Sequence, residues 1–187
     1  MRRGPGRVEM QVLGVLVPDE QEGPVVILRA VEGEETLVIR IGILEAQVLD
    51  MVWEDVEPPR PMTHDLFFET LKAFAMEVVE GEVTDLRDDI YYARLRVRQG
   101  DHVVDLDARP SDTMILCLLA RAPFYVKTEV FRKAQPQDVA EASRRQWMGF
   151  LKSLEAAEDP EGVLAGDEDT QDPAPMTDAE DKKGTVN

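Results

Sequence analysis

The chain has 187 residues, of which 43% are hydrophobic and 32% are charged, and its formal net charge is −17. This length accommodates one domain with an extension, or two small domains at most. A strongly acidic chain repels nucleic acid and anionic membranes at long range. Any phosphate-binding function therefore needs a local basic patch or a metal ion.

The cysteine content and the hydropathy pattern bear on the compartment. The single cysteine, Cys117, lies in an apolar stretch, so no disulfide framework can form within the chain, and this is typical of a reducing compartment. The first ten residues show no apolar segment of a secretory signal. No apolar run approaches the ~18 residues of a membrane span. We expect a cytoplasmic protein with no membrane partner.

The first half of the chain alternates between strand and helix patterns. Segments rich in Val, Ile and Leu predict three strands, over residues 8–17, 24–31 and 35–41. Apolar residues at helical spacing then predict a helix over residues 43–56. Three prolines exclude helix and inner strand from 57–65. Thr63 is the expected N-cap of a second helix over 64–76.

The second half repeats this order of elements. Strand patterns are found at residues 77–86, 90–99 and 102–107. A helix is predicted over 111–122, with Ser111 as its N-cap, and a short strand over 123–127. The chain thus predicts an α+β domain of two halves, each with three strands followed by a helix.

The C-terminal region has a different composition. Apolar side chains at helical spacing predict a final amphipathic helix within residues 136–154. The stretch Ala157–Asn187 holds ten acids, two lysines and few apolar residues, so we expect it to remain without a packed core. We divide the chain into a folded domain, a helix packed on it and an acidic tail, at residues 1–134, 135–156 and 157–187.

The segment "RQGDHV" predicts a β-hairpin with a type II′ turn at Gly100-Asp101, because glycine suits the first turn position. A two-residue loop pairs Gln99 with His102. The same register places the apolar side chains of both strands on one face, where we expect burial of Leu95, Val97, Val104 and Leu106.

The other face of this hairpin carries charge. The register places Arg94 opposite Asp107 and Arg96 opposite Asp105, which favours cross-strand ion pairs. It leaves Arg98 opposite Val103 and therefore free. A second interpretation of the same face is a nucleic-acid-binding strip formed by Tyr92, Arg94, Arg96 and Arg98.

Three polar motifs stand where helices are predicted to begin, namely "RIGILEA" (40–46), "PPRPMTHD" (58–65) and "DARPSD" (107–112). Helix N-termini expose donors and a partial positive charge, so they bind anions and phosphates. The same residues can also be explained as helix caps and first-turn acids, which leaves a purely structural role open.

These motifs supply side chains suited to phosphodiester chemistry. Arginines form bidentate contacts with phosphate, carboxylates hold hard divalent cations, and histidine changes charge near neutral pH. The candidate phosphate-binding residues are Arg60, Thr63, Arg109 and Ser111; the candidate metal ligands are Glu45, Asp65, Asp107 and Asp112; the candidate catalytic residues are Glu45, His64, Asp65 and Asp112.

Several enzyme signatures are missing from the sequence. It contains no Walker phosphate loop, nucleophile elbow, HExxH motif or CxxC motif. This argues against phosphoryl transfer and proteolysis of those types.

The stretches "IRIGILEAQVL", "PPRPMTHDLF" and "LDARPSDTMILCLLARAPFYV", in this order and spacing, resemble the bifunctional nuclease domain family. The resemblance covers about Val8 to Ala134. It implies a single α+β domain with a mixed, curved, barrel-like sheet, and cleavage of both RNA and DNA. The chain departs from the family at Thr113-Met114, where small apolar residues are more usual. The resemblance does not assign the catalytic residues.

The sequence thus favours a metal-assisted nuclease that acts on RNA and DNA with Mg²⁺ or Mn²⁺. The alternative is a non-catalytic regulatory module of the same fold that binds an anion or a protein at the same helix N-termini. We also expect a homodimer, because the edges of a small mixed sheet and the final helix both need cover.

Overall fold

The computed structural model describes residues 6–17 and 23–134. The helix predicted within residues 136–154 and the acidic segment from residue 157 lie outside the described residues. The division of the chain at residues 134 and 156 therefore stays a prediction.

The described residues form seven strands and four helices, in the order predicted up to residue 127. The strands are β1 (Arg7–Leu16), β2 (Val25–Ala30), β3 (Thr36–Arg40), β4 (Glu77–Arg87), β5 (Ile90–Gln99), β6 (His102–Ala108) and β7 (Phe124–Lys127). The helices are α1 (Ile43–Trp53), α2 (Thr63–Ala73), α3 (Pro110–Ala120) and α4 (Thr128–Lys133). Helix α4 was not expected from the sequence.

The strands form one mixed sheet in the order β3-β2-β1-β7-β4-β5-β6. Strands β1–β3 and β4–β6 are two antiparallel meanders, and β7 lies between them, antiparallel to β1 and parallel to β4. The mixed α+β fold with two similar halves is confirmed. The sheet is not closed into a barrel, because it ends at β3 and β6.

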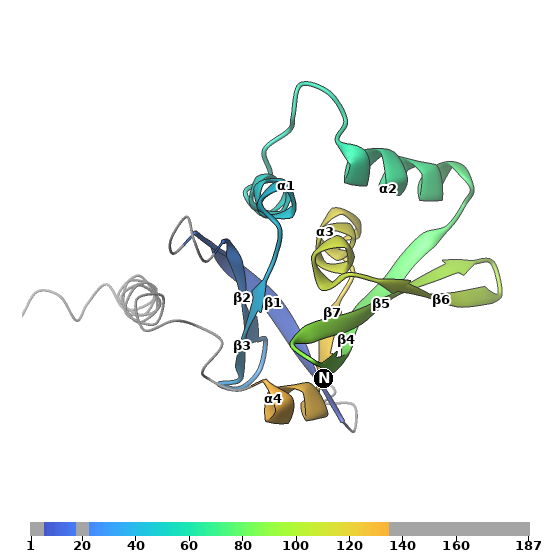
Figure 1. The fold of residues 1–187 in the computed structure, drawn as a ribbon. Coiled ribbons are helices and arrows are strands. Elements are labelled where there is room, and N and C mark those ends of the chain that lie inside the picture. Colours follow the sequence, from blue (N-terminus) through green and yellow to red (C-terminus); the bar gives the residue numbers. More distant parts are fainter. Residues whose placement is uncertain (1–5, 18–22, 135–187) are drawn as a thin grey trace, which may run out of the picture. The chain divides into compact units, whose positions relative to one another are not determined.

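Helix α3 lies at the centre of the described fold, between the sheet and the helices α1 and α2 (Figure 1). Its buried residues lie on all sides of the helix, namely Pro110, Ser111, Thr113, Met114, Ile115, Leu116 and Cys117. Gly81 of β4 allows the close approach of α3, since a Cβ atom there would lie 2.4 Å from Thr113 Cγ2. This packing holds the start of α3 beside α1 and α2.

The β5–β6 hairpin has the predicted register, with Arg96 opposite Asp105 and Gln99 opposite His102. Gly100 has φ = +56°, as the first position of a type II′ turn requires. The burial of Leu95 and Val97 is confirmed, at 2% and 4% exposure.

The predicted burial of Val104 and Leu106 is wrong, because each is 36% exposed. Both lie on β6, which is the edge strand of the sheet and pairs only with β5. An edge strand lacks the second neighbour that completes burial.

The charged face of the hairpin forms ion pairs, but some of the partners differ from those that the register predicted. Arg94 and Arg96 both bind Asp105, at 2.5 and 2.7 Å, and no ion pair among the described residues joins Arg94 to Asp107. Arg98 is not free, because its guanidinium lies 2.5 Å from Glu77 of β4. The arginines are therefore neutralised, which argues against a nucleic-acid strip on this face.

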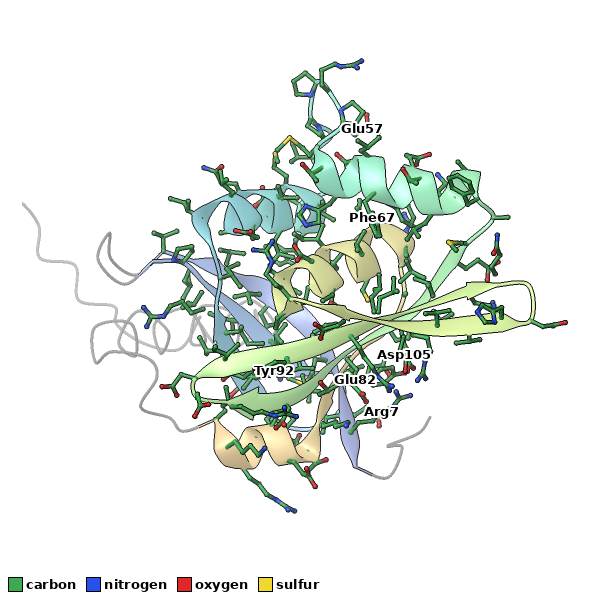
Figure 2. All side chains as sticks on the ribbon, turned by 45° about the vertical axis from the view of Figure 1, so that its right-hand side comes forward. Arg7, Glu57, Phe67, Glu82, Tyr92 and Asp105 are labelled. Atoms are coloured by element: carbon green, nitrogen blue, oxygen red, sulfur yellow. The ribbon has the colours of Figure 1, made fainter. Side chains whose placement is uncertain are left out.

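Two buried glutamates of β4 complete this charged layer. Glu82, 2% exposed, lies 2.9 Å from Arg94, and Glu80, 8% exposed, lies 2.8 Å from Arg96. Arg7 of β1 lies 2.9 Å from Glu80 and 3.7 Å from Glu82. Figure 2 shows the labelled Arg7 and Glu82 on this face of the sheet.

Candidate active site at three helix N-termini

The first turns of α1, α2 and α3 meet around four side chains, one or two from each helix. Arg109 lies 2.6 Å from Glu45 of α1 and 2.8 Å from Asp112 of α3. The Nε2 atom of His64, in α2, lies 3.0 Å from the Oδ1 atom of Asp112. The structure thus brings Glu45, His64, Arg109 and Asp112 together, one or more from each predicted motif. We call these four residues the polar cluster.

Proline positions Arg109. The residue before a proline is held in an extended conformation, and Arg109 has φ = −71° and ψ = 149° as the N-cap of α3. Its guanidinium donates to both oxygens of Asp112, from Nε at 2.8 Å and from Nη2 at 2.9 Å. This bidentate contact fixes the guanidinium plane.

Glycine positions Glu45. Gly42 is the N-cap of α1, and Glu45 stands three residues later, in the first turn. A Cβ atom at Gly42 would lie 2.1 Å from Glu45 Oε2. The carboxylate of Glu45 therefore folds back over Gly42, and from there it reaches Arg109.

Asp112 is ionised at neutral pH. The hydrogen bond from His64 is the largest cause that lowers the pKa of Asp112 to about 2, and Arg109 adds to it, while burial opposes both. An ionised carboxylate only accepts hydrogen bonds, so His64 Nε2 donates. His64 Nδ1 is buried and has no hydrogen-bond partner among the described residues.

The N-caps of α2 and α3 are not the residues that the sequence predicted. The N-cap of α2 is Met62, not Thr63, and the backbone N–H of Met62 donates to Asp65 at 2.8 Å. Asp65 therefore serves as a cap in this structure. Thr63 is exposed and is the first residue of the helix.

The N-cap of α3 is Arg109, not Ser111. Pro110 takes the first helical position, where its missing N–H costs no hydrogen bond. Ser111 falls in the first turn and is buried, with 5% exposure.

The remaining candidates are not part of the polar cluster. Arg60 and Asp65 line a hollow of about 420 Å³ between the proline-rich loop, α1 and α3. Arg109 and Ser111 line a separate groove of about 890 Å³. Arg60 and Arg109, the two arginines proposed to bind phosphate, therefore line different hollows. Asp107 is exposed on β6.

The four predicted metal ligands do not form one site. No three His, Cys, Asp or Glu side chains within residues 6–17 and 23–134 could hold one metal ion together. Glu45 and Asp112 both face the guanidinium of Arg109, and Asp65 is used as a cap. The guanidinium of Arg109 thus occupies the space between the two carboxylates that the polar cluster contributes.

Residues 26–138 match the bifunctional nuclease domain family. The chain belongs to this family. The match includes the whole polar cluster and confirms the resemblance seen in the three motifs. Within the described part of the chain, no helix has the length and apolar character needed to cross a membrane.

The chain is also similar to two uncharacterized proteins of Mycobacterium tuberculosis, from the strains CDC 1551 and H37Rv. Each is 36% identical over 126 residues, which cover 67% of this chain and 75% of the relative. The names of these two relatives give no activity.

Sequence reasoning missed the walls of the 890 Å³ groove. Ile90 and Tyr91 of β5 line it beside Arg109, but both stand in an ordinary strand pattern. The only sequence signal is their place directly after the two aspartates of the β4–β5 turn, which does not indicate a site.

Proposed function

We propose that this chain hydrolyses phosphodiester bonds of RNA and DNA at the polar cluster. The observation that carries the proposal is the meeting of three helix N-termini around Arg109 in a member of the bifunctional nuclease domain family. Helix N-termini and a guanidinium both favour a phosphate.

Arg109 is the residue that would bind phosphate. Its side chain is 63% exposed, whereas those of Glu45, His64 and Asp112 are 17%, 16% and 25% exposed. Contacts with Asp112 and Glu45 raise the pKa of Arg109, so its charge is permanent. The exposed guanidinium of Arg109 is thus the cationic group of the polar cluster that a phosphate can reach, at a distance where salt screens little.

Water is the nucleophile in this proposal, because DNA has no 2′-hydroxyl group. When Arg109 turns from its carboxylates to the phosphate, Glu45 and Asp112 become available to accept a proton from the attacking water. The leaving oxygen takes its proton from solvent. His64 acts as a positioning residue, since Nε2 holds Asp112 and Nδ1 is buried.

Mg²⁺ or Mn²⁺ was expected from the sequence, and an ion between Glu45 and Asp112 would have to replace Arg109 there. The proposal assigns no step to a metal ion. The cleavage assay is therefore run with Mg²⁺, with Mn²⁺ and with a chelator.

The test is cleavage of single-stranded RNA and DNA by wild-type protein and two variants of the polar cluster, Arg109→Gln and Asp112→Asn. We expect each to lower kcat/KM by about 100-fold or more, the size of loss seen when one stabilising group is removed from an active site. Arg98→Gln is the matched control, because Arg98 forms an exposed ion pair away from the cluster. Circular dichroism checks that all variants fold.

The second candidate is a non-catalytic module that binds an anion at the same residues. It is favoured by the fact that Arg109 already forms ion pairs with both carboxylates of the polar cluster. Wild-type protein that binds the oligonucleotides but cleaves none of them under all three conditions would overturn the proposed hydrolysis and support this module.

A further inference from the structure

Helix α2 has apolar side chains on two sides, and within the described residues only one side is covered. On the covered side Leu71 is buried and Phe68 packs against the core. The other side is exposed along the helix and contains no charged residue. Its members, spaced by helical turns and ending at the C-cap, are Thr63, Leu66, Phe67, Thr70, Ala73 and Phe74. We call these six residues the exposed stripe.

The exposed stripe leaves a large apolar area in water. Leu66 and Phe74 are each 65% exposed, and Phe67 is 42% exposed. A phenylalanine buries about 150–250 Å² when it packs, so the two aromatic rings of the stripe leave roughly 200 Å² uncovered. A helix that is apolar on more than one side is normally buried on each of them, and exposed apolar patches mark interaction sites. The exposed stripe is therefore a candidate contact surface.

The charged residues of α2 lie on a third side of the helix and are engaged within the chain. Asp65, Glu69 and Lys72 follow one another at helical spacing. Asp65 accepts a hydrogen bond from the backbone N–H of Met62 at 2.8 Å, and Lys72 Nζ lies 2.7 Å from Glu69. The exposed stripe thus presents no charge to a partner, so the surface that covers it is apolar and uncharged as well.

The exposed stripe is symmetric about Thr70. Leu66 and Phe74 lie four residues before and after it, and Phe67 and Ala73 lie three residues before and after it. In an antiparallel pair of α2 helices that cross at Thr70, Leu66 of each copy faces Phe74 of the other. Likewise the large Phe67 faces the small Ala73, and side chains of unequal size interdigitate well. The hydroxyl of Thr70 donates to the carbonyl of Leu66 at 2.7 Å, so it needs no water at the crossing.

The exposed stripe ends beside the edge of the sheet. Gln99, at the end of β5, donates from Nε2 to the carbonyl oxygen of Phe74 at 2.7 Å. Figure 1 shows α2 and β6 on the same side of the described fold. On the edge strand β6, Val104 and Leu106 are each 36% exposed. A second copy supplies both an apolar helix and a strand edge, and one twofold axis can bring both pairs together.

We propose that the exposed stripe of α2 is the contact surface for a second copy of this chain. The two α2 helices pack antiparallel across a twofold axis at Thr70, at the spacing of about 8–10 Å that is usual for packed helices. The stripe has no charged side chain to desolvate, so two copies of net charge −17 can meet there without burying a charge of the stripe.

Sedimentation equilibrium of the full chain tests this contact. Wild-type protein sediments at twice the chain mass of 21.0 kDa, and its association tightens with salt, because screening reduces the repulsion between two acidic copies. Leu66→Glu and Phe74→Lys each raise the dissociation constant by about 100-fold, because one interface position is worth about tenfold and the twofold axis counts it twice.

The variant that combines Leu66→Glu with Phe74→Lys dimerises again, because the new carboxylate of each copy faces the new ammonium group of the other. Within one chain these two positions lie about 12 Å apart along the helix, too far for a direct ion pair. Leu44→Glu is the matched control, because Leu44 is 70% exposed on α1 and does not belong to the stripe. It dimerises like wild-type protein, and circular dichroism checks that every variant folds.

Three results would each overturn the inference. A wild-type chain that stays at 21.0 kDa leaves the exposed stripe to a different protein. A dimer that Leu66→Glu and Phe74→Lys both leave intact has its contact elsewhere. If the single variants dissociate and the combined variant stays a monomer, the stripe does not pair with itself.

Discussion

Arg109 connects two helices because its guanidinium reaches Glu45 and Asp112 with different nitrogens. The extended backbone of Arg109 could be predicted from Pro110. Arg60 also precedes a proline, but its side chain lines a different hollow from that of Arg109. A proline fixes the backbone of the preceding residue, but the direction of that segment depends on packing that one sequence does not reveal.

The acid titration of Asp112 should be visible in the stability of the protein. The folded-state pKa of about 2 lies below the usual 3.8, so Asp112 contributes stability that is fully present above about pH 4 and is lost as the pH falls towards 2. Asp112→Asn should therefore cost on the order of 1–2 kcal/mol at pH 6, after allowance for its partial exposure.

Urea unfolding of both proteins at pH 6 and pH 2.5 measures this effect. We expect the difference in the free energy of unfolding to shrink at the lower pH. A difference that stays constant between the two pH values would show that the ion pairs of Asp112 do not stabilise the fold.

At the scale of elements, the sequence predicted the β5–β6 register because charge and apolarity both had to match across the pair. It did not predict the partners of the arginines. Glu77, Glu80 and Glu82 come from β4, whose pairing with β5 follows from the order of the strands and not from the hairpin. The same reason explains Val104 and Leu106, whose exposure depends on β6 lying at the edge.

The buried layer of ion pairs gives a sharp comparison between two arginines of β5. Arg94→Met leaves Glu82 buried without its contact at 2.9 Å, and breaking a buried pair in this way costs about 3 kcal/mol or more. Arg98→Met removes only an exposed pair with Glu77, which is worth about 0–1 kcal/mol.

Chemical denaturation of the two variants measures both costs. Because the residues occupy the same strand and undergo the same substitution, strand propensity cancels in the comparison. Equal losses for Arg94→Met and Arg98→Met would mean that the layer around Glu82 is hydrated and contributes little.

At the scale of the whole molecule, we expect the charge of residues 157–187 to affect the binding of nucleic acid. Residues 157–187 contain ten acids and two lysines, and they add to a field that repels polyanions. Truncation after residue 156 should strengthen binding of single-stranded RNA, with a larger gain at 20 mM than at 300 mM salt, because screening lengths shorten with salt. Fluorescence anisotropy at both salt concentrations measures the gain, and a weaker affinity after truncation would contradict it.

The edges of the sheet determine the remaining prediction, that the protein is a homodimer. Strand β6 ends the sheet at one side, and its exposed apolar residues are Val103, Val104 and Leu106. An uncovered edge with apolar side chains tends to pair with another strand, and a twofold axis lets two copies of β6 pair with each other. The charged layer on the other face of the hairpin would remain intact in such a dimer.

Light scattering of the wild-type chain should give twice the chain mass of 21.0 kDa. Val104→Lys places a charge on the paired edge, so we expect it to shift the mass to that of the monomer. Val31→Lys is the matched control, because Val31 is exposed at the end of β2 and adds the same charge away from β6. A wild-type mass of 21.0 kDa at micromolar concentration would contradict the dimer. A dimer that both variants preserve would place the interface elsewhere than β6.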